Sequence, residues 1–368
     1  MADASPGDNP RTPAAPAHLP FPLHGRQAGP RGRHGFAEER LVAVSYPVDE
    51  DFVRINSDVL ADEATIVYTC ELDDAQRAQA LQRAEVLVAW ELPREIPPGA
   101  LGEASRLRLV QLLSAGVDAV DFSAVPGRLA LASNAGAYAA AMSEHVLAMT
   151  LSLAKRLPQR HAALAAGQFD KWAPSLVLEG AICGILGLGG IGIATARLMT
   201  AFGARIHAVT RTGRTREPVE FVGTLADLDR VLVVADVLVI SLPLTLATHG
   251  LLGGRELALM KPAAIVVNVA RGPIIDQGAL YEHLRANPQF GAGIDTWWDE
   301  PTGDAPFRTD YPFFDLPNLM GSPHNSSIVA GTMRSAARVA AENVRRYLRG
   351  EAVRGVVRRA DYVAELRR

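Results

Sequence analysis

The sequence is poor in cysteine and contains no long apolar run. Its 368 residues include two cysteines, Cys70 and Cys183, and each stands in a short apolar run that predicts a strand. Two such cysteines form neither a disulfide framework nor a metal cluster, so we expect a reducing compartment and no bound metal. No apolar run reaches the roughly 18 residues of a membrane-spanning helix, and the N-terminus lacks the pattern of a secretory signal. The sequence therefore predicts a cytoplasmic protein without a membrane partner.

An excess of positive charge is also missing. The chain carries 37 basic and 40 acidic residues and a formal net charge of −3, and arginine supplies all but three of the basic residues. This balance creates no overall field that would draw the protein to a nucleic acid. Apolar residues make up 48% of the chain. Because a chain of this length usually forms more than one hydrophobic core, we expect two domains.

The sequence divides into a tail and a first α/β unit. Residues 1–40 are dense in proline, glycine, alanine and arginine without a regular apolar period, which predicts a disordered tail. From Leu41 to about Ala139, short apolar runs alternate with helix-length segments, and this alternation predicts a parallel sheet covered by helices. The apolar segment 142–157 predicts a largely buried helix, in which we interpret His145 as a core or interface residue.

A second α/β unit begins near Leu178. Its apolar runs, among them AICGIL, VLVISL and AIVVNV, again alternate with helix-like segments, which predicts a doubly wound sheet of the Rossmann type. The amphipathic segment after Pro323 is expected to pack back on the first unit as the last helix. The predicted fold class is therefore α/β, with two doubly wound parallel-sheet domains. The first domain comprises residues 41–139 and 325–350, and the second comprises residues 140–324.

A glycine-rich loop joins the first strand and the first helix of the second domain. Residues 187–192, GLGGIG, match the G-x-G-x-x-G pattern, which is weak evidence alone in a chain with 32 glycines. The strand before the loop and the helix after it provide the context in which backbone N–H groups hold a pyrophosphate. The predicted cofactor-binding residues of the loop are Gly187, Gly189, Gly190, Ile191 and Gly192. The second domain is then the cofactor domain, and the first is the substrate-binding domain.

The strand that follows the loop bears on the choice of cofactor. A site that prefers NAD usually carries an acid at the end of this strand, whereas the sequence here reads Thr210, Arg211, Thr212, Gly213, Arg214. The guanidinium groups of Arg211 and Arg214 could hold a ribose 2′-phosphate, which a carboxylate would repel. We therefore favour NADP over NAD. The alternative is that both arginines are solvated surface residues.

Several further motifs stand in a fixed order along the chain. They are LLSAGVDAVD (112–121), SEH in the long helix, SLPLTLATHGLL (241–252), NVARGPIIDQGAL (268–280), GIDTWWDEP (293–301) and GSPHNSS (321–327). Together with the glycine loop, these motifs resemble the D-isomer-specific 2-hydroxyacid dehydrogenase family, which includes phosphoglycerate dehydrogenases and glyoxylate/hydroxypyruvate reductases. The likeness covers about residues 41–350. It implies an oxidoreductase, acting on CH–OH donors, that moves a hydride between NAD(P)H and the alpha carbon of a small 2-keto or D-2-hydroxy acid.

The resemblance implies a catalytic Arg271, Glu300 and His324. These residue types suit the chemistry, because reduction of a keto acid places negative charge on the carbonyl oxygen and requires a proton donor there. A histidine ordinarily changes protonation near neutral pH, and a carboxylate beside it favours the charged imidazolium. The planar fork of Arg271 could hold the substrate carboxylate and the carbonyl oxygen together.

The resemblance also implies secondary contacts. Backbone N–H groups of Ala115, Gly116 and Val117 would supply the other half of substrate binding. The residues expected beside the nicotinamide and its ribose are Asp295, Leu242, Val269 and Ala270. We also expect a homodimer.

The sequence departs from the family pattern at some positions. Asn325, Ser326 and Ser327 follow the catalytic histidine, where a small, glycine-containing stretch is common. Trp297 and Trp298 could wall the substrate pocket, form a lid or pack inside the cofactor domain. Trp172 could reach a pocket or anchor a linker. Two other functions stay open. A formate dehydrogenase would pair its histidine with glutamine rather than Glu300, and a cofactor-sensing corepressor could share the fold.

Overall fold

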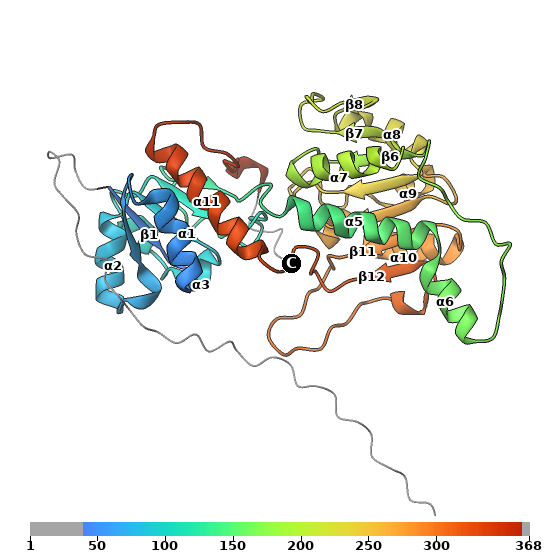
Figure 1. Cartoon of the computed structure of the whole chain (residues 1–368), viewed down its shortest axis with the longest axis horizontal. Coiled ribbons are helices and arrows are strands. Elements are labelled where there is room, and N and C mark those ends of the chain that lie inside the picture. Colours follow the sequence, from blue (N-terminus) through green and yellow to red (C-terminus); the bar gives the residue numbers. More distant parts are fainter. Residues whose placement is uncertain (1–39, 363–368) are drawn as a thin grey trace, which may run out of the picture. The chain divides into compact units, whose positions relative to one another are not determined.

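The structure of the chain, a computed structural model, describes residues 40–362. The prediction of a disordered tail over residues 1–40 therefore falls, except for Arg40, outside the described residues. The described part contains two sheets whose paired strands all run parallel. The predicted α/β class with two parallel-sheet domains is confirmed (Figure 1).

The first sheet has five strands in the order β2-β1-β3-β4-β5. Its strands are β1 (Leu41–Val44), β2 (Thr65–Tyr68), β3 (Val86–Ala89), β4 (Leu109–Leu112) and β5 (Ala130–Ala132). The helices of this part are α1 (Glu50–Leu60), α2 (Asp74–Arg83), α3 (Leu92–Glu95), α4 (Ala100–Glu103) and α11 (Thr332–Leu348). Local sequence sets their starts, since Asp49 accepts the Phe52 N–H at the start of α1 and Asp73 forms a capping box with Gln76 at the start of α2. Helix α11 packs against α1 and β4.

The second sheet has seven strands in the order β12-β11-β10-β9-β6-β7-β8. Its strands are β6 (Ile182–Leu186), β7 (Arg205–Val209), β8 (Phe221–Gly223), β9 (Val237–Ile240), β10 (Ile265–Asn268), β11 (Gly291–Ile294) and β12 (Leu319–Gly321). Read from β8, the order has the Rossmann arrangement, and the winding reverses between β6 and β9. Ligands bind at such a reversal, outside the carboxyl ends of the strands.

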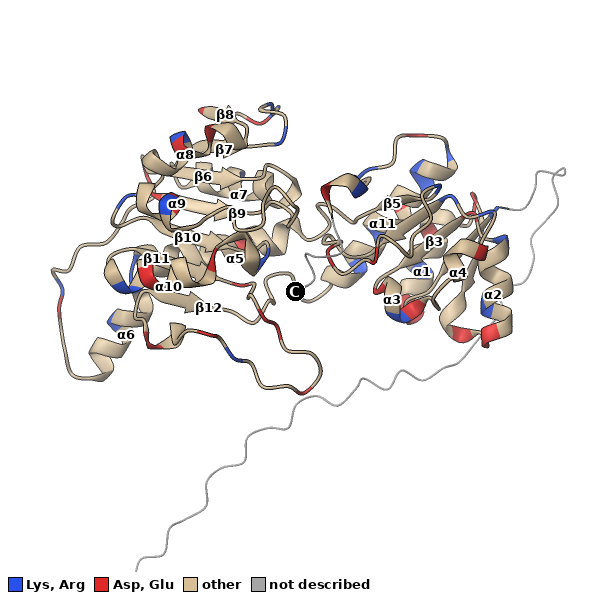
Figure 2. Ribbon diagram, turned by 180° about the vertical axis from the view of Figure 1, so that it is seen from behind, with Lys and Arg blue, Asp and Glu red and all other residues tan. Residues whose placement is uncertain are grey.

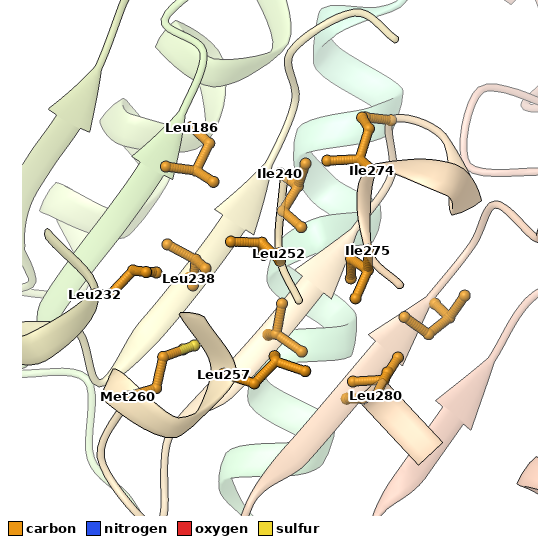
Figure 3. Close-up of a cluster of buried hydrophobic side chains, with 14 of the residues drawn as sticks. Leu186, Leu232, Leu238, Ile240, Leu252, Leu257, Met260, Ile274, Ile275 and Leu280 are labelled. Atoms are coloured by element: carbon orange, nitrogen blue, oxygen red, sulfur yellow. The ribbon is translucent and has the colours of Figure 1, made fainter. Parts of the chain in front are cut away.

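Helices cover both faces of the second sheet. Those helices are α5 (Ala139–Ala154), α7 (Gly190–Ala201), α8 (Leu228–Val234), α9 (Gly254–Leu259) and α10 (Gln277–Ala286). Helix α6 (Leu157–Ala165) contacts α5 and has no buried residue. Helices α5 and α7 lie side by side on one face (Figure 1). On the other face, Leu232, Leu257 and Leu280 of α8, α9 and α10 meet Leu238 and Ile240 of β9 in a continuous apolar core (Figure 3).

Charged side chains lie mainly on helices and connecting loops, while the central strands are almost free of them (Figure 2). This distribution follows from burial, because β9 and β10 are buried along their whole length. No helix in the described range 40–362 is long and apolar enough to cross a membrane. The predicted domain boundaries near residues 139 and 324 stay predictions.

Two local expectations were wrong. Cys183 lies in β6 as predicted, but Cys70 lies in a 3-10 helix, Thr69–Glu71, that directly follows β2. The predicted helix over 142–157 ends at Ala154, and α6 begins at Leu157. Pro158 lacks the N–H that would continue the first helix, and Arg156 takes a left-handed backbone (φ 51°) at the break. The apolar pattern of residues 142–157 did not reveal this break between two helices.

Candidate active site

The glycine loop connects β6 to α7 at the carboxyl edge of the second sheet. Gly187 has φ 97°, and a Cβ there would lie 2.9 Å from the backbone nitrogen of Leu242. A Cβ at Gly192 would overlap the carbonyl oxygen of Gly187, so the helix and the strand can approach this closely only without side chains. At Gly189, by contrast, no atom lies within 4 Å of the Cβ position. The loop is therefore tight against the protein at Gly187 and Gly192 and open at Gly189.

This loop fits the pyrophosphate of a dinucleotide. Gly189 is the N-cap residue of α7, a helix of 12 residues whose N-terminus carries partial positive charge. Gly190 and Ile191 form the first turn behind it, and Gly190 packs against the backbone of Gly136. Ser241, which follows β9, donates its hydroxyl to the Gly187 carbonyl at 2.8 Å and fixes the turn. The loop is therefore open where a phosphate would approach, as the sequence predicts.

The adenosine end of the expected cofactor site lies after β7. Thr210 follows the strand directly, and its hydroxyl oxygen accepts the backbone N–H of Arg214 at 3.2 Å, which closes a turn. The Arg211 side chain is 67% exposed, and its guanidinium lies 3.8 Å from the Asp361 carboxylate. Arg214 is exposed as well. Both arginines are therefore accessible to a ligand, and both are also solvated.

His324 and Glu300 form a direct pair. The His324 Nδ1 atom lies 2.7 Å from Glu300 Oε2, and the other carboxylate oxygen accepts the Trp297 backbone N–H at 3.0 Å. Burial alone would raise the pKa of Glu300, but the hydrogen bonds and the charge of His324 outweigh it and hold that pKa below its usual value. Glu300 is thus a carboxylate that orients the imidazole. Because Nδ1 is engaged, Nε2 is the ring nitrogen left for a ligand.

The backbone of His324 is unusual. Its φ is 50°, in the left-handed region that residues other than glycine seldom adopt, and its N–H donates to the Asp295 carbonyl at 2.8 Å. Asp295 follows β11 and is fully buried. Its side chain accepts a hydroxyl and two backbone N–H groups from the segment 322–326. A non-glycine residue held in this conformation is a frequent mark of a functional site.

Arg271 lies just beyond β10 and contacts the loop after β4. Its Nε donates to Asp118 Oδ2 at 3.0 Å, and its Nη1 donates to the Ala270 carbonyl at 2.6 Å. A Cβ at Gly116 would overlap the guanidinium, so only glycine permits this approach. Burial would raise the pKa of Asp118, but the charge and hydrogen bond of Arg271 prevail and lower it.

Asp118 is a site residue that sequence reasoning missed. It stands inside the motif LLSAGVDAVD, from which only the backbone of Ala115, Gly116 and Val117 received a role. The carboxylate lies 153 positions from Arg271 in the chain, so no local spacing could pair them. A motif residue of unassigned role was the only available signal.

The other predicted residues lie at carboxyl ends of strands. Ala115, Gly116 and Val117 follow β4, with Val117 buried and the other two partly exposed. Leu242 follows β9, and Val269 and Ala270 follow β10; all three are buried. Strands β6, β9 and β10 are neighbours in the sheet, so the loops beyond them adjoin one another. Their contact with a nicotinamide ribose stays a prediction.

The tandem tryptophans pack inside the protein. Trp297 is 6% exposed, and its indole N–H donates to the Ser322 carbonyl at 2.9 Å. The Trp298 ring stacks on Phe313 with 5.5 Å between the ring centroids, and its indole N–H donates to the Ile275 carbonyl at 2.6 Å. Packing within the cofactor domain is therefore favoured over a lid. Residues 40–362 contain no group of three or more potential metal ligands.

The site combines an oriented imidazole, a guanidinium and an anion-binding helix N-terminus. The guanidinium can hold a carboxylate, and the free ring nitrogen can give or take a proton where charge develops. Such a set suits proton-coupled chemistry on a small acid beside a dinucleotide.

Comparison with known proteins agrees with this chemistry. Residues 147–326 match the model of the D-isomer specific 2-hydroxyacid dehydrogenase NAD binding domain. The chain is 34% identical over 259 residues to the glyoxylate/hydroxypyruvate reductase B of Pectobacterium carotovorum, covering 68% of this chain and 79% of that protein. It is 30% identical over 320 residues to the D-3-phosphoglycerate dehydrogenase of Methanocaldococcus jannaschii, covering 86% of this chain but only 59% of that longer protein.

Solved structures show the same architecture. A proposed formate dehydrogenase from Pyrobaculum aerophilum superposes with a TM-score of 0.72 at 27% identity, covering 87% of this chain and 99% of that chain. A D-isomer specific 2-hydroxyacid dehydrogenase from Xanthobacter autotrophicus, in complex with NADPH and MES, superposes with a TM-score of 0.69 at 27% identity, covering 88% and 98%. From its motifs, its fold and these relatives, the chain belongs to the D-isomer-specific 2-hydroxyacid dehydrogenase family.

Proposed function

We propose that this chain transfers a hydride between a nicotinamide cofactor and the alpha carbon of a small 2-keto or D-2-hydroxy acid. The observation that carries the proposal is the 2.7 Å contact between His324 Nδ1 and Glu300 Oε2. This pair, Arg271 and the glycine loop all follow the carboxyl ends of strands in the second sheet. These groups supply the proton, the fixed positive charge and the dinucleotide cradle that such a reaction needs.

Each residue has a distinct role in the proposed reaction. The bound nicotinamide supplies the hydride in reduction and accepts it in oxidation. Arg271 holds the substrate carboxylate and polarises the carbonyl oxygen, with backbone N–H groups of residues 115–117 on the other side. His324 Nε2 donates a proton to that oxygen as negative charge develops, and takes it back in the oxidising direction. Glu300 stabilises the imidazolium and keeps the ring oriented.

We infer that NADP is preferred over NAD. The turn after β7 carries Arg211 and Arg214 where an acid would favour the unphosphorylated ribose, and both side chains are accessible. The related Xanthobacter protein was solved with NADPH. Arg211 lies only 3.8 Å from the Asp361 carboxylate, so a bound 2′-phosphate would have to compete with that acid.

We also propose that the chain forms a homodimer. Helix α6 and the segment after it leave large apolar side chains in water, among them Phe169 at 81% and Trp172 at 82% exposure. The other large exposed apolar residues of this segment are Leu157, Leu164 and Val177. Single exposed apolar residues are ordinary, but several within one stretch of the chain support a protein interface. A dimer by light scattering that dissociates on Phe169→Ser with Trp172→Ser supports this assembly; a monomeric wild type excludes it.

Two other functions receive less support. A formate dehydrogenase would need glutamine beside the histidine, whereas Glu300 stands here and is ionised. A cofactor-sensing corepressor of the same fold could retain Arg271, Glu300 and His324, but the sequence shows no recognisable partner-recruiting segment.

A turnover screen tests the proposal. Purified protein is mixed with NADPH or NADH and with glyoxylate, hydroxypyruvate or phenylpyruvate, and the loss of absorbance of the reduced cofactor is followed. We expect turnover with at least one keto acid, and a higher kcat/KM with NADPH. No turnover with any 2-keto acid, together with tight cofactor binding, would favour the sensor, and oxidation of formate would favour the formate dehydrogenase.

A further inference from the structure

We propose that His145 and Ser322 are positioning residues for the proposed catalytic histidine, acting through the buried carboxylate of Asp295. The catalytic consequence rests on the proposed function, whereas the structural link among these residues does not. The sequence placed His145 in a buried helix and assigned no role to Ser322. The structure joins both residues to the turn that carries His324.

The turn that carries His324 has an unusual backbone conformation. His324 has a left-handed backbone with φ 50°, which is uncommon for residues other than glycine, so the contacts around it help to hold this conformation. If this backbone relaxed, the imidazole would rotate away from Glu300, and the 2.7 Å contact would be lost. The surroundings of residues 324–326 therefore determine the orientation of the ring.

Hydrogen bonds to Asp295 hold this turn in place. Three successive backbone N–H groups end on Asp295. The His324 N–H donates to its carbonyl oxygen at 2.8 Å, the Asn325 N–H to Oδ1 at 3.1 Å, and the Ser326 N–H to Oδ2 at 3.3 Å. Asp295 is fully buried, so water does not replace these bonds. Its carboxylate must keep one orientation for both oxygens to reach their partners.

Ser322 and His145 keep the Asp295 carboxylate in that orientation. Ser322 Oγ lies 2.6 Å from Asp295 Oδ1 and 2.9 Å from His145 Nε2. A carboxylate only accepts hydrogen bonds, so the single hydroxyl proton of Ser322 points to Asp295. The hydroxyl oxygen then accepts from His145, which must carry a proton on Nε2. The order of donors is thus fixed from α5 to the carboxylate.

The same serine is also linked to Glu300 through Trp297. Its carbonyl oxygen accepts the Trp297 indole N–H at 2.9 Å, and the Trp297 backbone N–H donates to Glu300 at 3.0 Å. Ser322 therefore contacts both the residue that clamps the His324 turn and the residue that orients Glu300. A change at its hydroxyl should loosen the turn but leave the cofactor loop unchanged, because Ser241 rather than Ser322 bonds the Gly187 carbonyl of that loop.

The test compares Ser322→Ala, His145→Phe and the double variant with wild type. Glu144→Gln, an exposed neighbour on the same helix, is the matched control. Hydrogen exchange of a peptide spanning residues 320–330 reports on the turn directly. Steady-state kinetics supplies kcat and KM, quenching of tryptophan fluorescence supplies the Kd of the cofactor, and melting temperature reports on overall folding.

We expect Ser322→Ala to speed exchange in this peptide and to lower kcat about tenfold, because a small misplacement of a catalytic group has effects of this size or larger. The KM of the keto acid should change less than about twofold, since Ser322 contacts none of the expected substrate-binding groups. The Kd of the cofactor is measured separately, because Asp295 is expected beside the nicotinamide. The double variant should be no slower than the slower single variant, because both changes break one chain of bonds. Glu144→Gln should behave as wild type.

Unchanged exchange in Ser322→Ala would overturn the clamp, whatever the activity. Faster exchange with wild-type kcat would overturn the positioning role, and so would fully additive losses in the double variant. If the wild type turned over no 2-keto acid, the proposed function would fail, and exchange in Ser322→Ala and His145→Phe would decide the clamp alone. The two failures are therefore distinguishable.

Discussion

The two ends of the proposed cofactor site are built differently. At the keto acid end, His324 and Arg271 each hold a carboxylate of the protein, at 2.7 Å and 3.0 Å. At the adenosine end, Arg211 is 67% exposed and its nearest carboxylate oxygen is 3.8 Å away. Groups that act on a reacting bond need fixed geometry before the substrate arrives, whereas a group that only binds an outlying phosphate can be ordered by the ligand.

This contrast predicts that changes at the keto acid end lower turnover, and that changes at the adenosine end lower only affinity. The largest effect is expected for His324→Ala. Loss of a positioned general acid commonly lowers the rate by about 10²–10⁴, and we expect a fall in kcat within this range with little change in cofactor Kd. Stopped-flow reduction of a 2-keto acid measures it. The exposed His161 on α6 provides the control, as His161→Ala. Near-normal turnover of His324→Ala would remove the imidazole from the mechanism.

The next largest effect is expected for Arg271→Lys. The substitution keeps the charge but loses the planar fork, and with it the bonds to Asp118 and to the substrate carboxylate. We expect kcat/KM for the keto acid to fall about 10²-fold, equivalent to about 2.7 kcal/mol of transition-state stabilisation. Arg255→Lys changes an arginine that pairs with Asp229 on the surface, and should leave kcat/KM unaltered. Equal losses in the two variants would argue against a specific role for Arg271.

A smaller and selective effect is expected for Arg211→Ala. One charge-assisted hydrogen bond to a phosphate contributes roughly 1.5–3 kcal/mol, and exposure to water places this one at the low end, so the KM of NADPH should rise about tenfold. The KM of NADH and both kcat values should stay near wild type. Arg205, at the opposite end of β7 and 51% exposed, serves as the control. If NADPH and NADH weakened equally, the assignment of a 2′-phosphate contact would be wrong.

The smallest effect is expected for Asp118→Asn, and it should depend on pH. Arg271 lowers the pKa of Asp118 despite burial, so the carboxylate stabilises the folded chain above its unfolded pKa, near 3.9. That contribution is lost as the pH falls through the lowered folded value. We expect the variant to lose about 1 kcal/mol of unfolding free energy at pH 7, and less as the pH drops below about 4.

Urea denaturation over a pH series measures this difference. Asp304→Asn, at an exposed position, should show no comparable loss. A loss in Asp118→Asn that stays constant down to pH 3 would mean that the ion pair with Arg271 is not its cause.

The sequence allowed local motifs to be predicted, but not contacts between segments that are far apart in the chain. The glycine loop is a local motif, and the resemblance of several motifs to one family implied Arg271, Glu300 and His324 as catalytic residues. The structure brings His324 and Glu300 into contact at 2.7 Å. Asp118 and Ser322 were missed, because their partners lie 153 and 177 positions away in the chain. Contacts of this kind depend on how elements pack, which a single sequence does not reveal.

The errors in the fold have a similar origin. Apolar periodicity predicted the central strands of both sheets, since these are buried along their length. It failed at the ends of elements, where the backbone conformation of a single residue determines whether a strand or helix continues. Cys70 leaves the strand for a 3-10 turn, and Arg156 breaks a helix that its apolar pattern would continue.

Arg271, Glu300 and His324 are proposed to act together on one substrate. A crystal structure of the protein with NADP⁺ and oxamate, a stable analogue of a 2-keto acid, would show whether they do. We expect the Arg271 guanidinium to bind the oxamate carboxylate and His324 Nε2 to lie within hydrogen-bond distance of the oxamate carbonyl oxygen, with Glu300 still on Nδ1. An imidazole that faces away from the bound oxamate, with the analogue held by other residues, would exclude this arrangement.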